Sequence, residues 1–95
     1  MAEHPAELAA LLDGEGRVLR WPSKRSIQRQ VIDYLAGKFE TGRDYTEREV
    51  NALLNQYHTF DDAALLRREL FELGYLNREK DGSKYWRTPN TRLMP

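Results

Sequence analysis

Apolar residues recur at helical spacing over one long stretch of the chain. They occupy the i, i+4, i+7, i+8 and i+12 positions of a single stripe, at Ile27, Val31, Tyr34, Leu35 and Phe39. This spacing predicts a helix from about Ser23 to Phe39 with one buried face. Either Ser23 or Ser26 can cap its first turn.

A second helix has a clear start signal at Thr46. Thr46 and Glu49 have the spacing of a capping box. Tyr45 and Val50 occupy the two positions of a hydrophobic staple. The buried face of this helix is then expected at Val50, Leu53, Leu54 and Tyr57.

A third helix is predicted to begin near Asp61. With Asp61 as its cap, Phe60 and Leu65 can staple the entry. The inner face is expected at Ala63, Leu66, Leu70 and Leu73. Gly74 is placed to end the helix in a left-handed conformation, after which Tyr75 can fold back over the last turn.

The pattern after Gly74 changes to that of a β-hairpin. Strands are predicted at 75–79 and 84–88, because Asp81-Gly82 between them is a strong turn signal. A turn centred there pairs Glu79 with Lys84, Arg78 with Tyr85, and Asn77 with Trp86. Alternation puts Tyr85 and Trp86 on opposite faces, so one ring should be buried and the other partly exposed.

The N-terminal residues predict smaller elements. A two-turn helix over 5–13 is too short to be stable alone, so its leucines must dock on this domain or on a partner. These are Leu8, Leu11 and Leu12. A short strand is predicted at 17–21, ended by Pro22. Either this strand or the residues around Tyr45 can extend the hairpin into a three-stranded sheet.

The order of these elements indicates the fold. Helix, turn, helix and hairpin follow one another as in a winged helix-turn-helix. We therefore predict an α+β, winged helix-turn-helix-like fold with a three-helix core, a C-terminal β-hairpin wing and a short N-terminal helix. The expected divisions are a helix and turn at 1–16, the winged-helix-like domain at 17–88, and a flexible tail at 89–95.

Composition narrows the classes of function. Ninety-five residues make one domain, and fifteen basic residues balance fifteen acidic ones. A net charge of zero argues against strong non-specific nucleic-acid binding but leaves room for a local basic patch. The absence of cysteine fits a cytoplasmic location and excludes a thiolate metal site. No stretch predicts a membrane span or a secretory signal.

Basic residues form the main candidate site. Between Glu15 and Asp33 the chain carries five cations and no acid. Lys24 and Arg25 lie in the first helical turn, where a cation is unfavourable by about 0.3–1 kcal/mol, which can mark a function. We therefore predict anion or nucleic-acid contacts here, on the third helix and on the hairpin, at Arg20, Lys24, Arg25, Arg29, Arg67, Arg68, Lys80 and Lys84. The alternative is a solvated basic face paired with acids.

The third helix would be the one that enters the major groove, but its composition suits this role poorly. Its outer face should carry Ala64, Arg68 and Phe71, and four acids make the helix net negative. An outward Phe71 suits a protein contact or cover by the N-terminal helix. A protein interface is accordingly predicted at Leu8, Leu11, Leu12 and Phe71.

No catalytic or metal-binding pattern is present in the sequence. His4 and His58 are the only histidines, and no residue set has the logic of a triad or of a phosphate-binding loop. We expect neither an enzyme nor a cofactor.

Several short pieces resemble a known family, and together they span roughly Leu12 to Arg87. They are Leu12-Asp13, Gly16-Arg17, Trp21-Pro22, Lys24-Arg25, Lys38-Phe39-Glu40, Tyr45-Thr46-Glu47-Arg48-Glu49-Val50-Asn51, Leu66-Arg67-Arg68-Glu69-Leu70, Gly82 and Tyr85-Trp86-Arg87. The family is a bacterial domain of unknown function, often fused C-terminally to helix-turn-helix transcriptional regulators of the arsenical-repressor type. The resemblance implies a winged-helix-like fold and a bacterial cytoplasmic origin, and it transfers no site residue. Eleven residues precede the match, so we expect this copy to work alone or in trans.

Two hypotheses of function follow. The first is a non-enzymatic, DNA-associated transcriptional regulatory module. The second is a protein-interaction or dimerisation module built on the same winged-helix frame.

Overall fold

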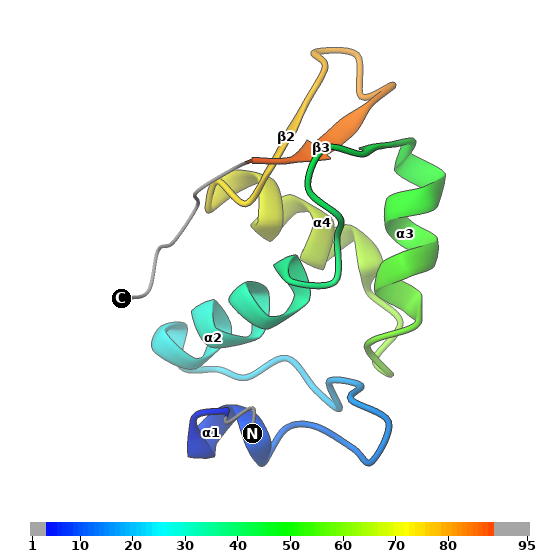
Figure 1. Cartoon of the computed structure of the whole chain (residues 1–95). Coiled ribbons are helices and arrows are strands. Elements are labelled where there is room, and N and C mark those ends of the chain that lie inside the picture. The colour runs from blue at the N-terminus through cyan, green and yellow to red at the C-terminus, as the bar shows by residue number, and fades with distance from the viewer. Residues whose placement is uncertain (1–3, 89–95) are drawn as a thin grey trace.

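The computed structural model describes residues 4–88, which form an α+β fold with four helices and one three-stranded antiparallel sheet. The elements are α1 (Ala6–Ala9), α2 (Arg25–Ala36), β1 (Asp44–Tyr45), α3 (Glu47–Asn55), α4 (Ala63–Glu72), β2 (Leu76–Arg78) and β3 (Tyr85–Arg87). Figure 1 shows the sheet at one end of the molecule and α1 at the other, with the three longer helices between them. The architecture is compatible with a winged-helix-like fold. The tail predicted for 89–95 lies outside the described residues.

The hairpin forms with the predicted register. Asn77 pairs with Trp86, and Arg78 pairs with Tyr85. Gly82 adopts a φ of 76°, a left-handed conformation that suits the glycine of the turn. Tyr85 is buried and Trp86 is partly exposed, as the alternation predicts.

The third strand is β1, the second of the two predicted alternatives. Asp44 pairs with Trp86 and Tyr45 pairs with Tyr85, so β3 lies in the middle of the sheet. The predicted strand 17–21 is wrong. Only Val18 pairs there, in isolated bridges to Leu12 and His58. Leu12 lies at the end of the N-terminal segment and His58 lies in the turn before α4, so neither pairing continues as a strand.

The start of α3 confirms the capping box. The Thr46 hydroxyl accepts a hydrogen bond from the Glu49 N–H, and the Glu49 carboxylate accepts one from the Thr46 N–H. Both staple residues, Tyr45 and Val50, are buried.

Replacing this cap gives a first test of the local structure. Thr46→Ala is expected to lower the free energy of unfolding by about 1 kcal/mol, because the Glu49 N–H loses its acceptor. Urea unfolding would measure the change. Thr46→Ser retains a hydroxyl and should lie close to the wild type, so equal losses in the two variants would contradict this role of the cap.

The caps of α2 and α4 differ from the sequence predictions. Lys24 occupies the N-cap position of α2 without a side-chain cap bond, so neither predicted serine caps it. Asp62, not Asp61, caps α4 by accepting from the Leu65 N–H. The cap moves by one residue because Asp61 is in a left-handed conformation with φ 56°.

The end of α4 matches the prediction closely. Gly74 has φ 87°. The Tyr75 N–H donates to the Leu70 carbonyl at 2.9 Å, and the Gly74 N–H donates to the Phe71 carbonyl at 3.1 Å. This pair of bonds is the Schellman motif, and it directs the chain into β2.

The N-terminal leucines belong to the core, which corrects their prediction as a partner-facing surface. Leu8 and Leu11 are only 3% and 4% exposed, and Leu12 packs partly buried against the same cluster. The predicted helix shortens to Ala6–Ala9, and it packs against α2. The leucines of this N-terminal segment are therefore buried by the domain itself.

Within residues 4–88, none of the helices is both long enough and apolar enough to span a membrane.

Candidate functional site

A cleft lies where α4, the hairpin and the start of α3 meet. It encloses about 330 Å³. Its lining residues are Glu47, Arg67, Arg68, Phe71, Glu72, Arg78 and Tyr85. Three guanidinium groups therefore lie beside two aromatic rings. Arg67 and Arg68 are predicted contacts, and Arg78 joins them from the hairpin.

The Phe71 ring contacts the hairpin, whereas the two predicted roles were a protein contact and cover by the N-terminal helix. The Arg78 guanidinium carbon lies 4.5 Å from the centre of the Phe71 ring. This is a cation–π arrangement, worth about 0.5–1 kcal/mol at an exposed site. The contact also leaves Phe71 only partly exposed, so it offers less apolar surface to a partner protein than predicted.

Arg67 joins α4 to α3. Its guanidinium donates to the Asn51 side-chain oxygen and lies 3.7 Å from a Glu47 oxygen. Its side chain is only 20% exposed. The structure therefore commits Arg67 to packing between two helices rather than to a ligand.

Some cations of the hairpin are paired with acids within residues 4–88, and others are not. Lys84 lies 3.8 Å from both Asp44 and Glu79 and is shared between them. Lys80 is exposed near the turn. Over residues 4–88, no ion pair is formed by Arg68, Arg78 or Lys80. We call these three residues the wing face.

The basic segment 17–29 is partly neutralised by acids that are close in space. Arg17 binds Asp13 at 2.8 Å. The Arg17 N–H and guanidinium together hold the pKa of the Asp13 carboxyl below its ordinary value. Arg25 lies 3.0 Å from Glu69 of α4.

Three exposed cations of this segment have no ion pair within the described part of the chain. They are Arg20, Lys24 and Arg29. The dense positive patch expected between Arg17 and Arg29 is therefore reduced by its two acid-bound arginines.

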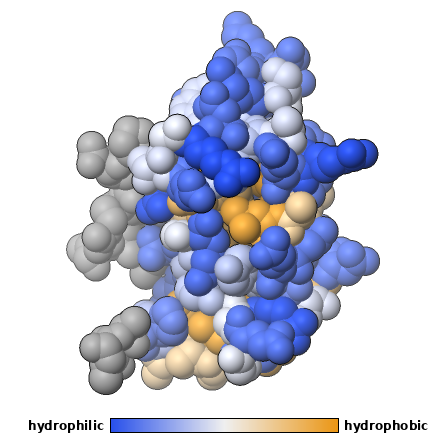
Figure 2. All heavy atoms as spheres, turned by 45° about the vertical axis from the view of Figure 1, so that its right-hand side comes forward, coloured by the Kyte–Doolittle hydropathy of each residue, from blue (hydrophilic) through white to orange (hydrophobic). Residues whose placement is uncertain are grey.

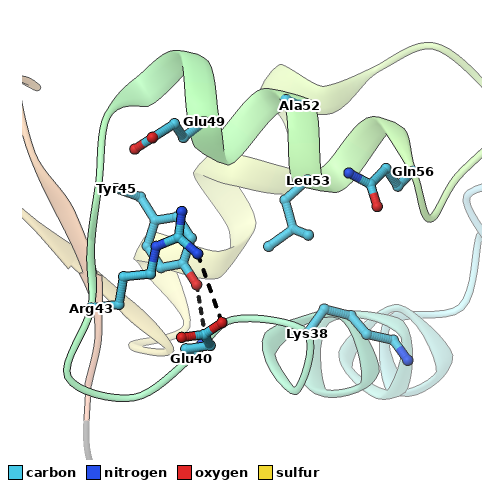
Figure 3. Close-up of a pocket in the computed structure, with 8 residues that line it drawn as sticks. All are labelled: Lys38, Glu40, Arg43, Tyr45, Glu49, Ala52, Leu53 and Gln56. Atoms are coloured by element: carbon cyan, nitrogen blue, oxygen red, sulfur yellow. Dashed lines mark hydrogen bonds and ion pairs between the residues drawn. The ribbon is translucent and has the colours of Figure 1, made fainter.

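A second cleft, of about 280 Å³, lies between α3 and the turn after α2 (Figure 3). The Arg43 guanidinium stacks 4.6 Å from the centre of the Tyr45 ring and lies 3.7 Å from Glu40. The Tyr45 hydroxyl accepts a hydrogen bond from the Glu40 N–H at 2.8 Å. Sequence reasoning missed this cleft, because its residues come from a turn and from a helix face without a shared motif.

The charges of this second cleft balance. Lys38 and Arg43 oppose Glu40 and Glu49, and Glu49 already serves the capping box. Figure 2 shows a small hydrophobic patch near the middle of the face in view, bordered by hydrophilic side chains. Balanced charge around the cleft favours no anion, so we do not place a nucleic-acid contact here.

His58 has a structural role in the turn between α3 and α4. It is 5% exposed, and its Nε2 accepts a hydrogen bond from the Asp62 N–H at 2.9 Å. Its Nδ1 therefore carries the proton and donates to the Leu54 carbonyl at 2.7 Å. Residues 4–88 contain no group of three or more histidines, cysteines or acids arranged to hold a metal.

Comparison with known proteins gives one match. A family model described as "Uncharacterized protein conserved in bacteria (DUF2087)" matches residues 17–87. No curated protein and no solved structure matches the chain.

Proposed function

The chain belongs to this family of proteins conserved in bacteria, and we propose that it is a DNA-associated regulatory module that contacts the duplex through α4 and the hairpin. The support comes first from the order of elements. α2, β1, α3, α4, β2 and β3 follow one another as in a winged helix-turn-helix, where the second helix of the turn motif lies in the major groove. In this chain that helix is α4.

The observation that carries the proposal is the charge of the wing face. Arg68 extends from α4, while Arg78 and Lys80 extend from the hairpin. All three cations lack an acidic partner within residues 4–88, and two of them, Arg68 and Arg78, line the same cleft. Uncompensated cations on adjoining elements are what a phosphate backbone recognises.

The wing face is better suited to contacts with the DNA phosphate backbone than to recognition of base edges. Its outer helical positions include Ala64, Phe71 and Glu72, and Arg68 is the one donor among them that can reach a guanine edge. Phosphate contacts position a protein without reading sequence. We therefore expect binding with weak sequence preference.

The protein-interaction alternative has less support. Leu8 and Leu11 are buried in the domain, and Arg78 covers Phe71. Three of the four residues that motivated a partner surface are thus accounted for within the chain.

The proposal predicts a definite salt dependence. Three phosphate contacts should give a slope of log K against log salt of about −2.7 for duplex DNA. Arg68→Ala should reduce the slope by about 0.9 and weaken binding about eight-fold at about 0.1 M salt. Fluorescence anisotropy with a labelled duplex would measure both quantities.

Arg43→Ala is the matched control, since it removes the same charge from the other cleft. It should leave the slope unchanged. The proposal fails if wild type at micromolar concentration shows no binding at low salt. It also fails if Arg43→Ala and Arg68→Ala lower the slope equally.

A further inference from the structure

A groove separates α1 from the start of α2. It encloses about 310 Å³ and is distinct from both clefts described above. Its apolar lining includes Leu11, Pro22 and Ile27, and its charged lining is Arg20, Lys24 and Glu7.

The two cations of the groove are uncompensated. Arg20 and Lys24 are exposed, and no acid of residues 4–88 lies within ion-pair distance of either. Their neighbours Arg17 and Arg25 are both paired, with Asp13 and Glu69. The groove therefore presents two unpaired positive charges that an anionic group could bind.

The apolar side of the groove consists of side chains that are fixed by packing against the core. Leu11 and Pro22 are buried, and Ile27 packs partly buried against the core. Leu19 is 45% exposed, and its N–H donates to the Leu11 carbonyl at 2.8 Å, so exposed apolar surface adjoins the groove. An occupant thus meets an apolar floor beside two cations.

We propose that this groove binds a small amphipathic monocarboxylate. The carboxylate lies between Arg20 and Lys24, and the apolar chain or ring lies along Leu11 and Ile27. The volume is at the lower end of small-molecule sites and suits a ligand of on the order of ten non-hydrogen atoms. Glu7 on the lining disfavours a second carboxylate. This inference is independent of DNA binding, because none of these residues belongs to the wing face.

Two-dimensional ¹H–¹⁵N NMR with octanoate as the probe tests the groove. Octanoate should shift the amides of Leu11, Arg20, Lys24 and Ile27 in a saturable way. Arg20→Ala and Lys24→Ala should each weaken the apparent Kd by about two- to five-fold, as expected for loss of one exposed ion pair. Arg29→Ala, a matched exposed arginine of α2 outside the groove, should leave the Kd unchanged.

Two further ligands separate the parts of the recognition. 1-Octanol has the same chain without the charge, and acetate has the charge without the chain, so both should bind more weakly than octanoate. The proposal is overturned if octanoate gives no saturable shifts or shifts scattered residues. It is equally overturned if octanol binds as well as octanoate, or if Arg29→Ala weakens binding as much as Lys24→Ala. The dispersion of each variant's spectrum confirms that it is folded.

Discussion

Leu66→Ala and Leu70→Ala are each expected to lower the free energy of unfolding by about 2–5 kcal/mol. Both side chains are fully buried on the inner face of α4. Truncation removes apolar contacts and leaves a cavity that the surrounding helices can close only in part. A domain of this size has little stability to spare, so either change brings it close to unfolding.

Urea unfolding followed by circular dichroism would measure these losses. Leu19→Ala is the matched control, because it makes the same chemical change at a side chain that is 45% exposed. It should stay within about 0.5 kcal/mol of wild type, as is usual for surface changes. If both helix variants also stay within that range, the assignment of the inner face of α4 is wrong.

The parts of the fold that the sequence predicts well are set by neighbouring residues. The capping box needs only Thr46 and Glu49, and the end of α4 needs only Gly74 with its left-handed conformation. The hairpin register follows from Asp81-Gly82 because a tight turn fixes which residues face each other. Each signal lies within a few residues of the structure that it determines.

The parts that the sequence predicts poorly depend on contacts that residue types and spacing do not specify. The predicted strand 17–21 fails because Val18 finds its partners at a turn and at the end of the N-terminal segment. Asp61 and Asp62 are equally good caps by residue type. The choice between them falls to Asp62, whose N–H is held by His58.

The candidate site likewise contains features that the sequence predicts and features that it does not. Residue types identify the cations, but they do not show which of them are already paired with acids. Arg67 is held from sixteen residues away by Asn51, and Arg25 is held by Glu69 of another helix. The stacking of Arg78 on Phe71 likewise joins the hairpin to α4. No local pattern reports such contacts, so sequence alone overstated the number of free cations.

His58→Ala is expected to lower the free energy of unfolding by about 2–4 kcal/mol. The change empties a buried position and leaves the Asp62 N–H without an acceptor. The Leu54 carbonyl is less affected, because it also accepts a hydrogen bond from the Tyr57 N–H at 2.9 Å. The loss of the bond to Asp62 should therefore account for most of the polar part of the effect.

Two substitutions separate the two ring nitrogens of His58. A glutamine amide can reach the position of Nε2 and accept from the Asp62 N–H, whereas an asparagine amide lies nearer the position of Nδ1. We therefore expect thermal or urea unfolding to rank the variants so that His58→Gln is the least destabilised, followed by His58→Asn and then His58→Ala. Because Asp62 caps α4, this ranking ties the start of the proposed DNA-contacting helix to one buried side chain. A ranking in which asparagine restores more stability than glutamine would show that the bond to Leu54 is the more important one.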